Sequence, residues 1–266
     1  MIMKLYAIQP EAYKAYKANI DKAREGFDLT EFVNQRKQAR LEDGIGHVYV
    51  YGALINDATP IERKMGNTDY GDVIQDLNQV VAAGAKAIVL HVNSGGGLVT
   101  GSTECATAIQ NARVPVVVHS EGTTASAAYK LACGATWLVA SPSCEVGNIG
   151  AIMSWVDDSE MMAAVGVQVL ALTNDGATLK STGHLPSIND DQLAFLQEAI
   201  NEAGEDFRNH VLSNRPNIDE TVFNAGWWSG SKALALGLID ELGDEPLAIQ
   251  RATELMVLTQ EAFVEV

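Results

Sequence analysis

The chain has 266 residues, of which 47% are apolar, and a formal net charge of −16 at pH 7. This length and apolar fraction are typical of a globular protein with one large domain or two small ones. The negative charge argues against a nucleic-acid-binding protein, because phosphate backbones require clustered lysine and arginine side chains.

The cysteines and the N-terminus predict a cytoplasmic protein. The three cysteines, Cys105, Cys133 and Cys144, are odd in number and match no metal-ligand spacing. We therefore expect buried free thiols in a reducing compartment, and neither a metal site nor a cofactor. No apolar run reaches the roughly 18 residues of a membrane span, and no signal-peptide core follows the first four residues. We expect no membrane anchor.

Residues 1–44 are predicted to form an N-terminal helical arm. Apolar residues recur at spacings near three and four between residues 11 and 41, which indicates one or two amphipathic helices. Residues 1–40 carry eight Lys/Arg and five Asp/Glu, a net charge of +3, so the remainder carries −16 − 3 = −19. The basic surface of the arm is either a solvated helix face or a contact with an acidic neighbour.

From residue 45 onward, predicted strands and helices alternate. The strands are 46–54, 87–92, 114–118, 136–140 and 167–172. The helices are 72–83, 102–112, 127–135, 161–165, 190–212 and 231–236, and the loops or turns are 56–70, 141–150 and 226–230. The alternation predicts an α/β body with a mainly parallel sheet. Residues 251–266 form a C-terminal tail, which is apolar enough from Met256 onward to dock on the body or on a neighbouring chain.

A single serine stands at one of the predicted strand-to-helix junctions. Residues 121–129, EGTTASAAY, surround Ser126 with side chains too small to cover it. The positive end of the following helix would favour a developing negative charge at this position. A serine before a helix is more commonly an N-cap, whose hydroxyl accepts a hydrogen bond from a backbone N–H of the first turn. If the chain is an enzyme, Ser126 is its reactive group.

Three consecutive glycines, Gly95, Gly96 and Gly97, follow the predicted strand 87–92. They lack both the spacing of the dinucleotide-binding fingerprint and the lysine of the P-loop. Two interpretations remain. The glycines form a plain tight turn, or they let a backbone N–H approach a substrate carbonyl as half of an oxyanion hole, with the N–H of Ala127 as the other half.

A reactive serine also needs a base. None of the five histidines is flanked by residues that mark a catalytic histidine, and none can be excluded; they are His47, His91, His119, His184 and His210. Lys180, in the polar loop 173–183, is the only Lys or Arg between Lys130 and Arg208. A lysine acts as a base only in its neutral form, which burial favours. The alternative is an ordinary exposed loop lysine.

Five segments, in order, resemble motifs of the signal peptide peptidase A family of Ser/Lys peptidases, in the Clp protease and crotonase superfamily. Residues 92–97, VNSGGG, are similar to the N-S-P-G-G loop of the superfamily, and residues 124–129, TASAAY, to the family's A-A-S-G-G-Y serine motif. The remaining segments are 146–150 (VGNIG, similar to T-G-S-I-G), 176–183 (GATLKSTG, similar to G-x-x-K-s-x-G) and 233–243 (ALALGLIDELG, similar to A-x-x-x-G-L-I-D-x-x-G). The resemblance covers residues 45–250.

The resemblance implies a Clp protease/crotonase-like fold, a superhelix of repeated β-β-α units, for a peptidase domain of residues 45–250. It implies that Ser126 is the nucleophile, that Lys180 is the general base, and that Gly97 and Ala127 donate the oxyanion-hole N–H groups. Asn148 stands where the family has a serine that orients the lysine, and we assign it, with Gly96, to a lysine-orienting or substrate loop. Two further departures are Gly95 in place of proline and Ala127-Ala128 in place of Gly-Gly.

The same resemblance implies a serine endopeptidase that cleaves extended polypeptides without a cofactor. Single-domain members of the family can form rings in which serine and lysine come from neighbouring subunits, so we expect a homo-oligomer. The chain looks most like short cytoplasmic and bacteriophage members that process capsid or scaffold proteins, which places it in the host cytoplasm or the virion. The alternatives are a crotonase-like acyl-CoA enzyme, for which the acidic body lacks a basic patch, and an assembly protein of the same fold without catalysis.

Overall fold

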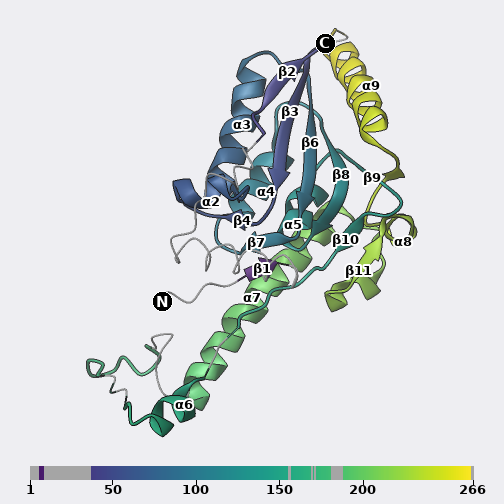
Figure 1. Cartoon of the computed structure of the whole chain (residues 1–266). Coiled ribbons are helices and arrows are strands. Elements are labelled where there is room, and N and C mark those ends of the chain that lie inside the picture. The colour runs from purple at the N-terminus through teal and green to yellow at the C-terminus, as the bar shows by residue number, and fades with distance from the viewer. Residues whose placement is uncertain are drawn as a thin grey trace.

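A computed structural model describes residues 6–8, 37–154, 157–168, 170, 172–180 and 188–264 (Figure 1). The predicted helices of residues 11–41 lie mainly outside the described residues. Figure 1 shows an α/β body, from which one long helix extends to a small helical segment. In the part of the chain that the structure describes, no helix is long and apolar enough to cross a membrane.

The body is built on a mainly parallel sheet, as predicted. Within the described residues this sheet has eight strands, and its central strands β3, β6 and β8 are parallel neighbours. The strands are β2 (Arg40–Glu42), β3 (Ile45–Tyr51), β6 (Ala87–Ser94), β8 (Val116–Ala125), β9 (Trp137–Ala140), β10 (Glu145–Gly147), β11 (Trp227–Ser229) and β12 (Glu241–Leu242). The first half of β8 pairs with β9 and its last residues pair with β10, both in parallel. The predicted turns 141–150 and 226–230 therefore contain the short strands β10 and β11.

Successive side chains of the central strands point to opposite faces of the sheet, and helices cover both faces. Val48, Leu90 and Val118 belong to the larger core, which also includes residues of α3 (Tyr70–Ala82), α4 (Ser102–Gln110) and α5 (Ala127–Cys133). The other face packs against Ala248 and Ala252 of α9 (Glu245–Val264). Residue 250, the predicted boundary of the C-terminal tail, lies within α9, and the division into domains stays a prediction.

A second, small sheet lies beside the first, in the order β1-β7-β4-β5. Its strands are β1 (Tyr6–Ile8), β4 (Leu54–Ile55), β5 (Thr68–Asp69) and β7 (Gly96–Leu98). The prediction of a loop over 56–70 was wrong, because this segment contains β5 and the helix α2 (Pro60–Lys64). A capping box between Thr59 and Glu62 stabilises the first turn of α2.

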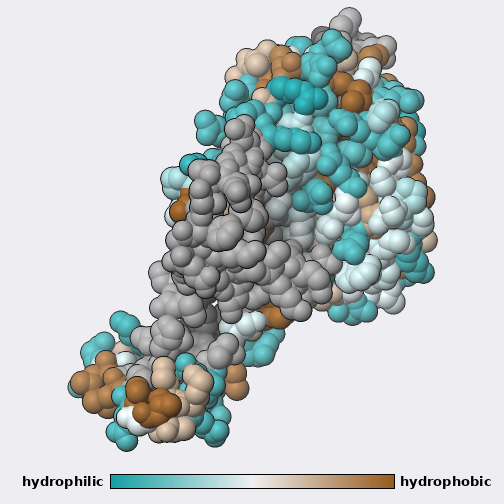
Figure 2. All heavy atoms as spheres, in the orientation of Figure 1, coloured by the Kyte–Doolittle hydropathy of each residue, from teal (hydrophilic) through white to brown (hydrophobic). Residues whose placement is uncertain are grey.

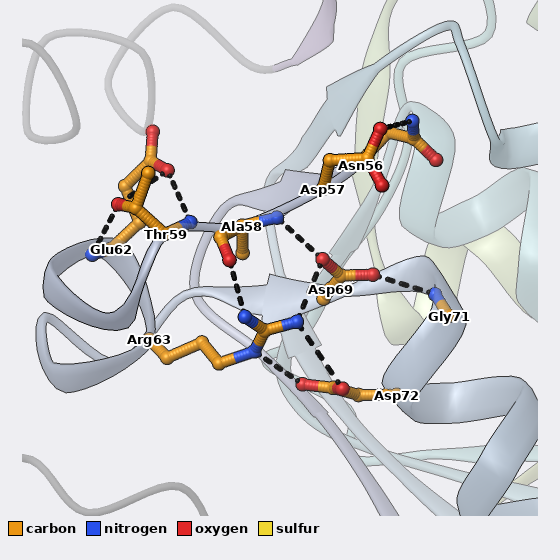
Figure 3. A network of polar contacts seen from close by, with 9 residues as sticks. All are labelled: Asn56, Asp57, Ala58, Thr59, Glu62, Arg63, Asp69, Gly71 and Asp72. Atoms are coloured by element: carbon orange, nitrogen blue, oxygen red, sulfur yellow. Dashed lines mark hydrogen bonds and ion pairs between the residues drawn. The ribbon is translucent and has the colours of Figure 1, made fainter.

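Arg63 fixes α2 and β5 to the start of α3 (Figure 3). Its guanidinium donates to Asp69 at 3.1 Å and to Asp72 at 2.8 Å, and also to the carbonyl of Ala58. The buried Asp69 carboxylate also accepts the N–H of Gly71, at 2.7 Å, and thereby caps α3. This network orients β5, and through the β5–β4–β7 pairing it supports the glycine run.

The long helix α7 (Asp190–Asn214) packs on the body in its second half, where Phe207 and Val211 are buried. Beyond its N-terminal end lies α6 (Ser159–Ala164) (Figure 1). The strand predicted over 167–172 was wrong for the described residues of that segment, which are exposed and not in a strand. An apolar alternating pattern forms a strand only where a neighbouring strand can pair with it, and this segment lies away from both sheets (Figure 1).

The remaining helices follow the predicted pattern with small shifts at their ends. The predicted helices at 72–83, 102–112, 127–135, 190–212 and 231–236 correspond to α3, α4, α5, α7 and α8 (Gly230–Ala235). A short 3-10 helix, η2 (Glu220–Asn224), precedes β11. The three cysteines are buried free thiols, as predicted.

Candidate active site

Ser126 lies at the turn between β8 and α5, in a conformation that side chains rarely adopt. Its φ is 56° and its ψ is −126°, and its backbone N–H donates to the carbonyl of Gly147 at 2.8 Å. Non-glycine residues in such regions cost about 1–3 kcal/mol each and concentrate at functional sites. The strand enters this turn from Ala125, which pairs with Gly147 of β10, so two neighbouring strand ends hold the turn in place.

The hydroxyl of Ser126 does not cap the helix that follows it. It makes no capping hydrogen bond, and the buried Oγ has no hydrogen-bond partner among the described residues. The N-cap interpretation of this serine is therefore wrong. Most buried side-chain polar atoms have a partner, so an exception at a strained turn requires an explanation.

The backbone around Ser126 supplies N–H groups with free hydrogen-bonding capacity. Ala127 is the first residue of α5, and the first N–H groups of a helix have no acceptor within it. All residues of α5 are buried, and the hydroxyl of Tyr129 donates to the carbonyl of Leu238 at 2.9 Å. The helix is thus fixed in the core, and its N-terminus stays at the end of β8.

The glycine run reaches the same end of the sheet. Ser94 pairs with Thr124 of β8, and β7 packs against α5, so Gly97 and Ser126 both lie just beyond paired strand positions. Gly96 and Gly97 belong to strand β7, whereas Gly95 lies between β6 and β7, so the run is more than a plain tight turn. A Cβ atom at Gly97 would lie 1.9 Å from the carbonyl oxygen of Leu54, so only glycine fits there. Gly96 has a φ of 97°, and its N–H donates to the hydroxyl of Ser94 at 3.1 Å.

Asn93 connects the two strand ends, a role that sequence reasoning did not assign. Its Oδ1 accepts the N–H of Thr123 at 3.1 Å and would lie 2.9 Å from a Cβ atom at Gly122. The signal was present in the sequence, because Asn93 opens the Asn-Ser-Gly segment. Its contact with β8 depends on a strand pairing that the local sequence does not reveal.

Asn148 follows β10 and lies next to the Ser126 turn. Its φ is 56°, its backbone N–H donates to the carbonyl of Gly226 at 2.6 Å, and its Nδ2 donates to the carbonyl of Ala225 at 2.8 Å. The side-chain amide donor is thus engaged by the backbone. The Oδ1 atom is the part of this amide that could accept a hydrogen bond from an amine.

The structure does not bring Lys180 to Ser126 within one chain. Lys180 is exposed, and its carbonyl accepts a hydrogen bond from Gln192 in the first turn of α7, at 3.4 Å. The helix α5, which follows Ser126, contacts α7 where Lys130 pairs with Asp206. Asp206 lies fourteen residues after Gln192 in α7. Fourteen helical residues span about 21 Å. Lys180 therefore lies near the end of α7 that extends away from the body (Figure 1).

Lys130 is the lysine closest in sequence to Ser126, but it is bound elsewhere. Its Nζ donates to Asp206 at 2.5 Å and to Thr103 at 2.8 Å, and its side chain is buried. This pairing lowers the pKa of the Asp206 carboxyl, although burial opposes the shift. A side-chain nitrogen engaged by these two partners is not available to Ser126.

Comparison with known proteins agrees with this architecture. The Peptidase family S49 model matches residues 108–259, and the Clp protease model matches residues 46–146. The second match agrees with the predicted Clp protease-like fold of the parallel body.

Three curated relatives are proteases by name. The chain is 29% identical over 202 residues to a putative protease of Methanocaldococcus jannaschii, covering 74% of this chain and 64% of the relative. It is 32% identical over 227 residues to Protease 4 of Salmonella typhi, covering 81% and 35% respectively. It is 25% identical over 222 residues to Capsid assembly protease C of Escherichia phage lambda, covering 81% and 50%. The chain thus spans less than two thirds of the length of each. The family match covers more than half of the chain, which belongs to peptidase family S49.

Proposed function

We propose that this protein is a serine endopeptidase in which Ser126 is the nucleophile and Lys180 of a neighbouring subunit is the general base. The observation that carries the proposal is the buried Oγ of Ser126, which has no hydrogen-bond partner in the described part of the chain and lies at a strained turn. Membership of a peptidase family supports the hydrolytic chemistry. The relative named Capsid assembly protease C supports a polypeptide substrate, such as a capsid or scaffold protein.

The proposed reaction uses the backbone groups around the turn. Ser126 Oγ bonds to the peptide carbonyl carbon while its proton passes to Lys180 Nζ. The N–H groups of Gly97 and Ala127 stabilise the resulting oxyanion. The same proton then passes to the leaving amine, and water hydrolyses the acyl-enzyme. Asn148 Oδ1 and Gly96 would position the incoming lysine or the substrate.

Assembly of several chains would bury Lys180 and bring it close to the serine of a neighbouring subunit. In one chain this lysine is exposed, whereas a base needs the neutral amine that burial favours. Apolar side chains gather on the same extension, at the lower left of Figure 2, and exposed apolar patches commonly mark protein interfaces. They include Met161, Val165, Leu170 and Leu172, which are 63–86% exposed. We infer that a homo-oligomer, such as a ring, buries this surface and delivers Lys180 to the next subunit.

Replacing the serine tests the proposal directly. The Ser126→Ala variant should cleave an unfolded polypeptide at least about 10³-fold more slowly than the wild type, because the attacking oxygen is absent. It should also lose labelling by a fluorophosphonate probe. Ser213→Ala is the matched control and should cleave normally, since the Ser213 hydroxyl donates to the carbonyl of Asn209 in its own helix. Wild-type cleavage by Ser126→Ala would refute the nucleophile assignment, and an unlabelled wild type would favour a non-catalytic assembly protein.

The position of the N-terminal strand β1 leads to a prediction about substrate binding. An extended substrate would add to the edge of β7 beside Gly97, and this is the edge at which β1 pairs antiparallel. Deleting residues 1–10 should therefore raise kcat/KM for an unfolded polypeptide several-fold. Deleting residues 1–5 leaves β1 in place and should not change it. An unchanged or lower kcat/KM in the longer deletion, with an unchanged melting temperature, would place the substrate elsewhere.

A further inference from the structure

Three histidines that play no part in the proposed peptidase reaction gather on the sheet face that α9 covers. His91 of β6 pairs in register with His119 of β8 on one side and with Tyr49 of β3 on the other. His47 lies two residues before Tyr49, on the same face. All three imidazoles are buried, and Glu121 and Glu245 face them from β8 and the start of α9.

Two imidazole nitrogens in this cluster lack partners. His91 Nδ1 and His119 Nδ1 are buried and make no hydrogen bond among the described residues. Both are directed at the same carboxylate oxygen, because Glu121 Oε1 lies 3.5 Å from His91 Nδ1 and 4.0 Å from His119 Nδ1. One ring nitrogen each of His91 and His119 and a carboxylate oxygen of Glu121 lie within 4.8 Å of one another. Two ligand atoms about 2.1 Å from a tetrahedral zinc ion lie roughly 3.4 Å apart, so a small closure would complete the geometry.

The surrounding contacts hold these donors in the orientation that a metal requires. The Nε2 atom of His91 lies 3.0 Å from His47 Nδ1, and donation from Nε2 leaves the lone pair of Nδ1 directed at Glu121. The hydroxyl of Tyr51 donates to Glu121 Oε1 at 2.7 Å, and the ring of Tyr49 stacks on His91. Such supporting hydrogen bonds are typical of histidine and carboxylate ligands.

The chemistry of the three donors is that of a transition-metal site. All three imidazoles are buried, and an imidazole nitrogen is the commonest protein ligand of transition metals. Two imidazoles and one carboxylate suit zinc and neighbouring divalent ions rather than calcium or magnesium. The side chain of Glu121 is 28% exposed, which gives an ion a path from solvent.

We propose that His91, His119 and Glu121 bind one divalent transition-metal ion of the zinc class. The site joins β6 to β8 and is separate from the serine. Glu121 precedes Ser126 by five strand residues, which is about 17 Å along the strand. The competing arrangement has a proton in place of the ion, with His47 donating to His91 Nε2 and His91 Nδ1–H directed at Glu121.

Metal titration of the tag-free, EDTA-treated full chain distinguishes these arrangements. Calorimetry with Zn²⁺ should show one high-affinity site per chain, and Co²⁺ should give visible d–d bands characteristic of nitrogen and oxygen ligands. The Glu121→Gln variant keeps an acceptor for Tyr51 and should fold, but should bind at least about 10-fold more weakly. Zn²⁺ should raise the melting temperature of the wild type and not that of Glu121→Gln.

The matched control is Glu104→Gln, which removes the same charge from an exposed position of α4 and should bind Zn²⁺ like the wild type. Absence of Zn²⁺ and Co²⁺ binding would overturn the proposal in favour of the proton arrangement. Equal binding by the wild type and Glu121→Gln would also overturn it. A loss of Zn²⁺ binding in the Glu245→Gln variant alone would also overturn the proposal, because that result would place the ion on the His47 side of His91.

Discussion

Mixing inactive Ser126→Ala and Lys180→Ala variants should restore peptidase activity that neither has alone. Each variant should be at least about 10³-fold impaired, because one lacks the nucleophile and the other the base. If every site combines the serine of one subunit with the lysine of the next, some sites in a mixed ring contain both. Random mixing in equal amounts makes about a quarter of the sites complete, since each interface in a head-to-tail ring is used once. The measurement is cleavage of an unfolded polypeptide after subunit exchange.

The control for this experiment is a mixture of Ser126→Ala with the Ser126→Ala/Lys180→Ala double variant, which contains no nucleophile and should stay inactive. Exchange itself should be verified by mass spectrometry of differently labelled subunits. If exchange is complete and the two single variants still fail to restore activity, serine and lysine act within one chain. The extension that carries Lys180 would then have to fold back by about the 21 Å that separate Gln192 from Asp206 along α7.

The parallel body could be predicted from the sequence because its signals are local. The run of apolar residues at 87–92 fits a strand buried on both faces, and the turn residues at Gly84 and Gly134 end the helices that precede the next strands. The place of the proposed site in the fold follows from a related signal. Ser126 follows β8 and Gly97 follows β6, and parallel strands place their carboxyl ends at one edge of a sheet.

The features that could not be predicted depend on contacts between distant residues. The helix α2 was not predicted because its segment is polar, and polar segments are typical of loops. The ion pairs of Arg63 with Asp69 and Asp72, which hold α2 in place, are not visible in the local sequence. The histidine cluster was missed for the same reason, since His47, His91 and His119 come from three strands and meet only through their register. In the segment 167–172 the local pattern predicted a strand that the described residues do not form, because this segment lies on an extension without a sheet to join.

The Gly97→Ala variant should lose both stability and activity. The added methyl group would lie 1.9 Å from the carbonyl oxygen of Leu54 and 2.6 Å from its Cα atom, and this backbone cannot move without breaking the β4–β7 pairing. Overpacking of this kind costs roughly 1–3 kcal/mol and sometimes more in the free energy of unfolding. The shift would also displace the proposed oxyanion donor, and loss of one donor lowers kcat by about 10²–10³-fold. Urea unfolding and polypeptide cleavage measure the two effects.

Gly204→Ala is the matched control for Gly97→Ala. Gly204 lies within α7, and apart from its chain neighbours and its own helix backbone no heavy atom of the described residues lies within 4 Å of the Cβ position there. Alanine in a helix interior is more stable than glycine by about 0.5–1 kcal/mol, so this variant should unfold at a higher urea concentration and cleave normally. Two identical substitutions should thus change stability in opposite directions. If Gly97→Ala instead unfolds and cleaves like the wild type, β7 does not hold Gly97 against Leu54, and the oxyanion donor must come from another backbone group.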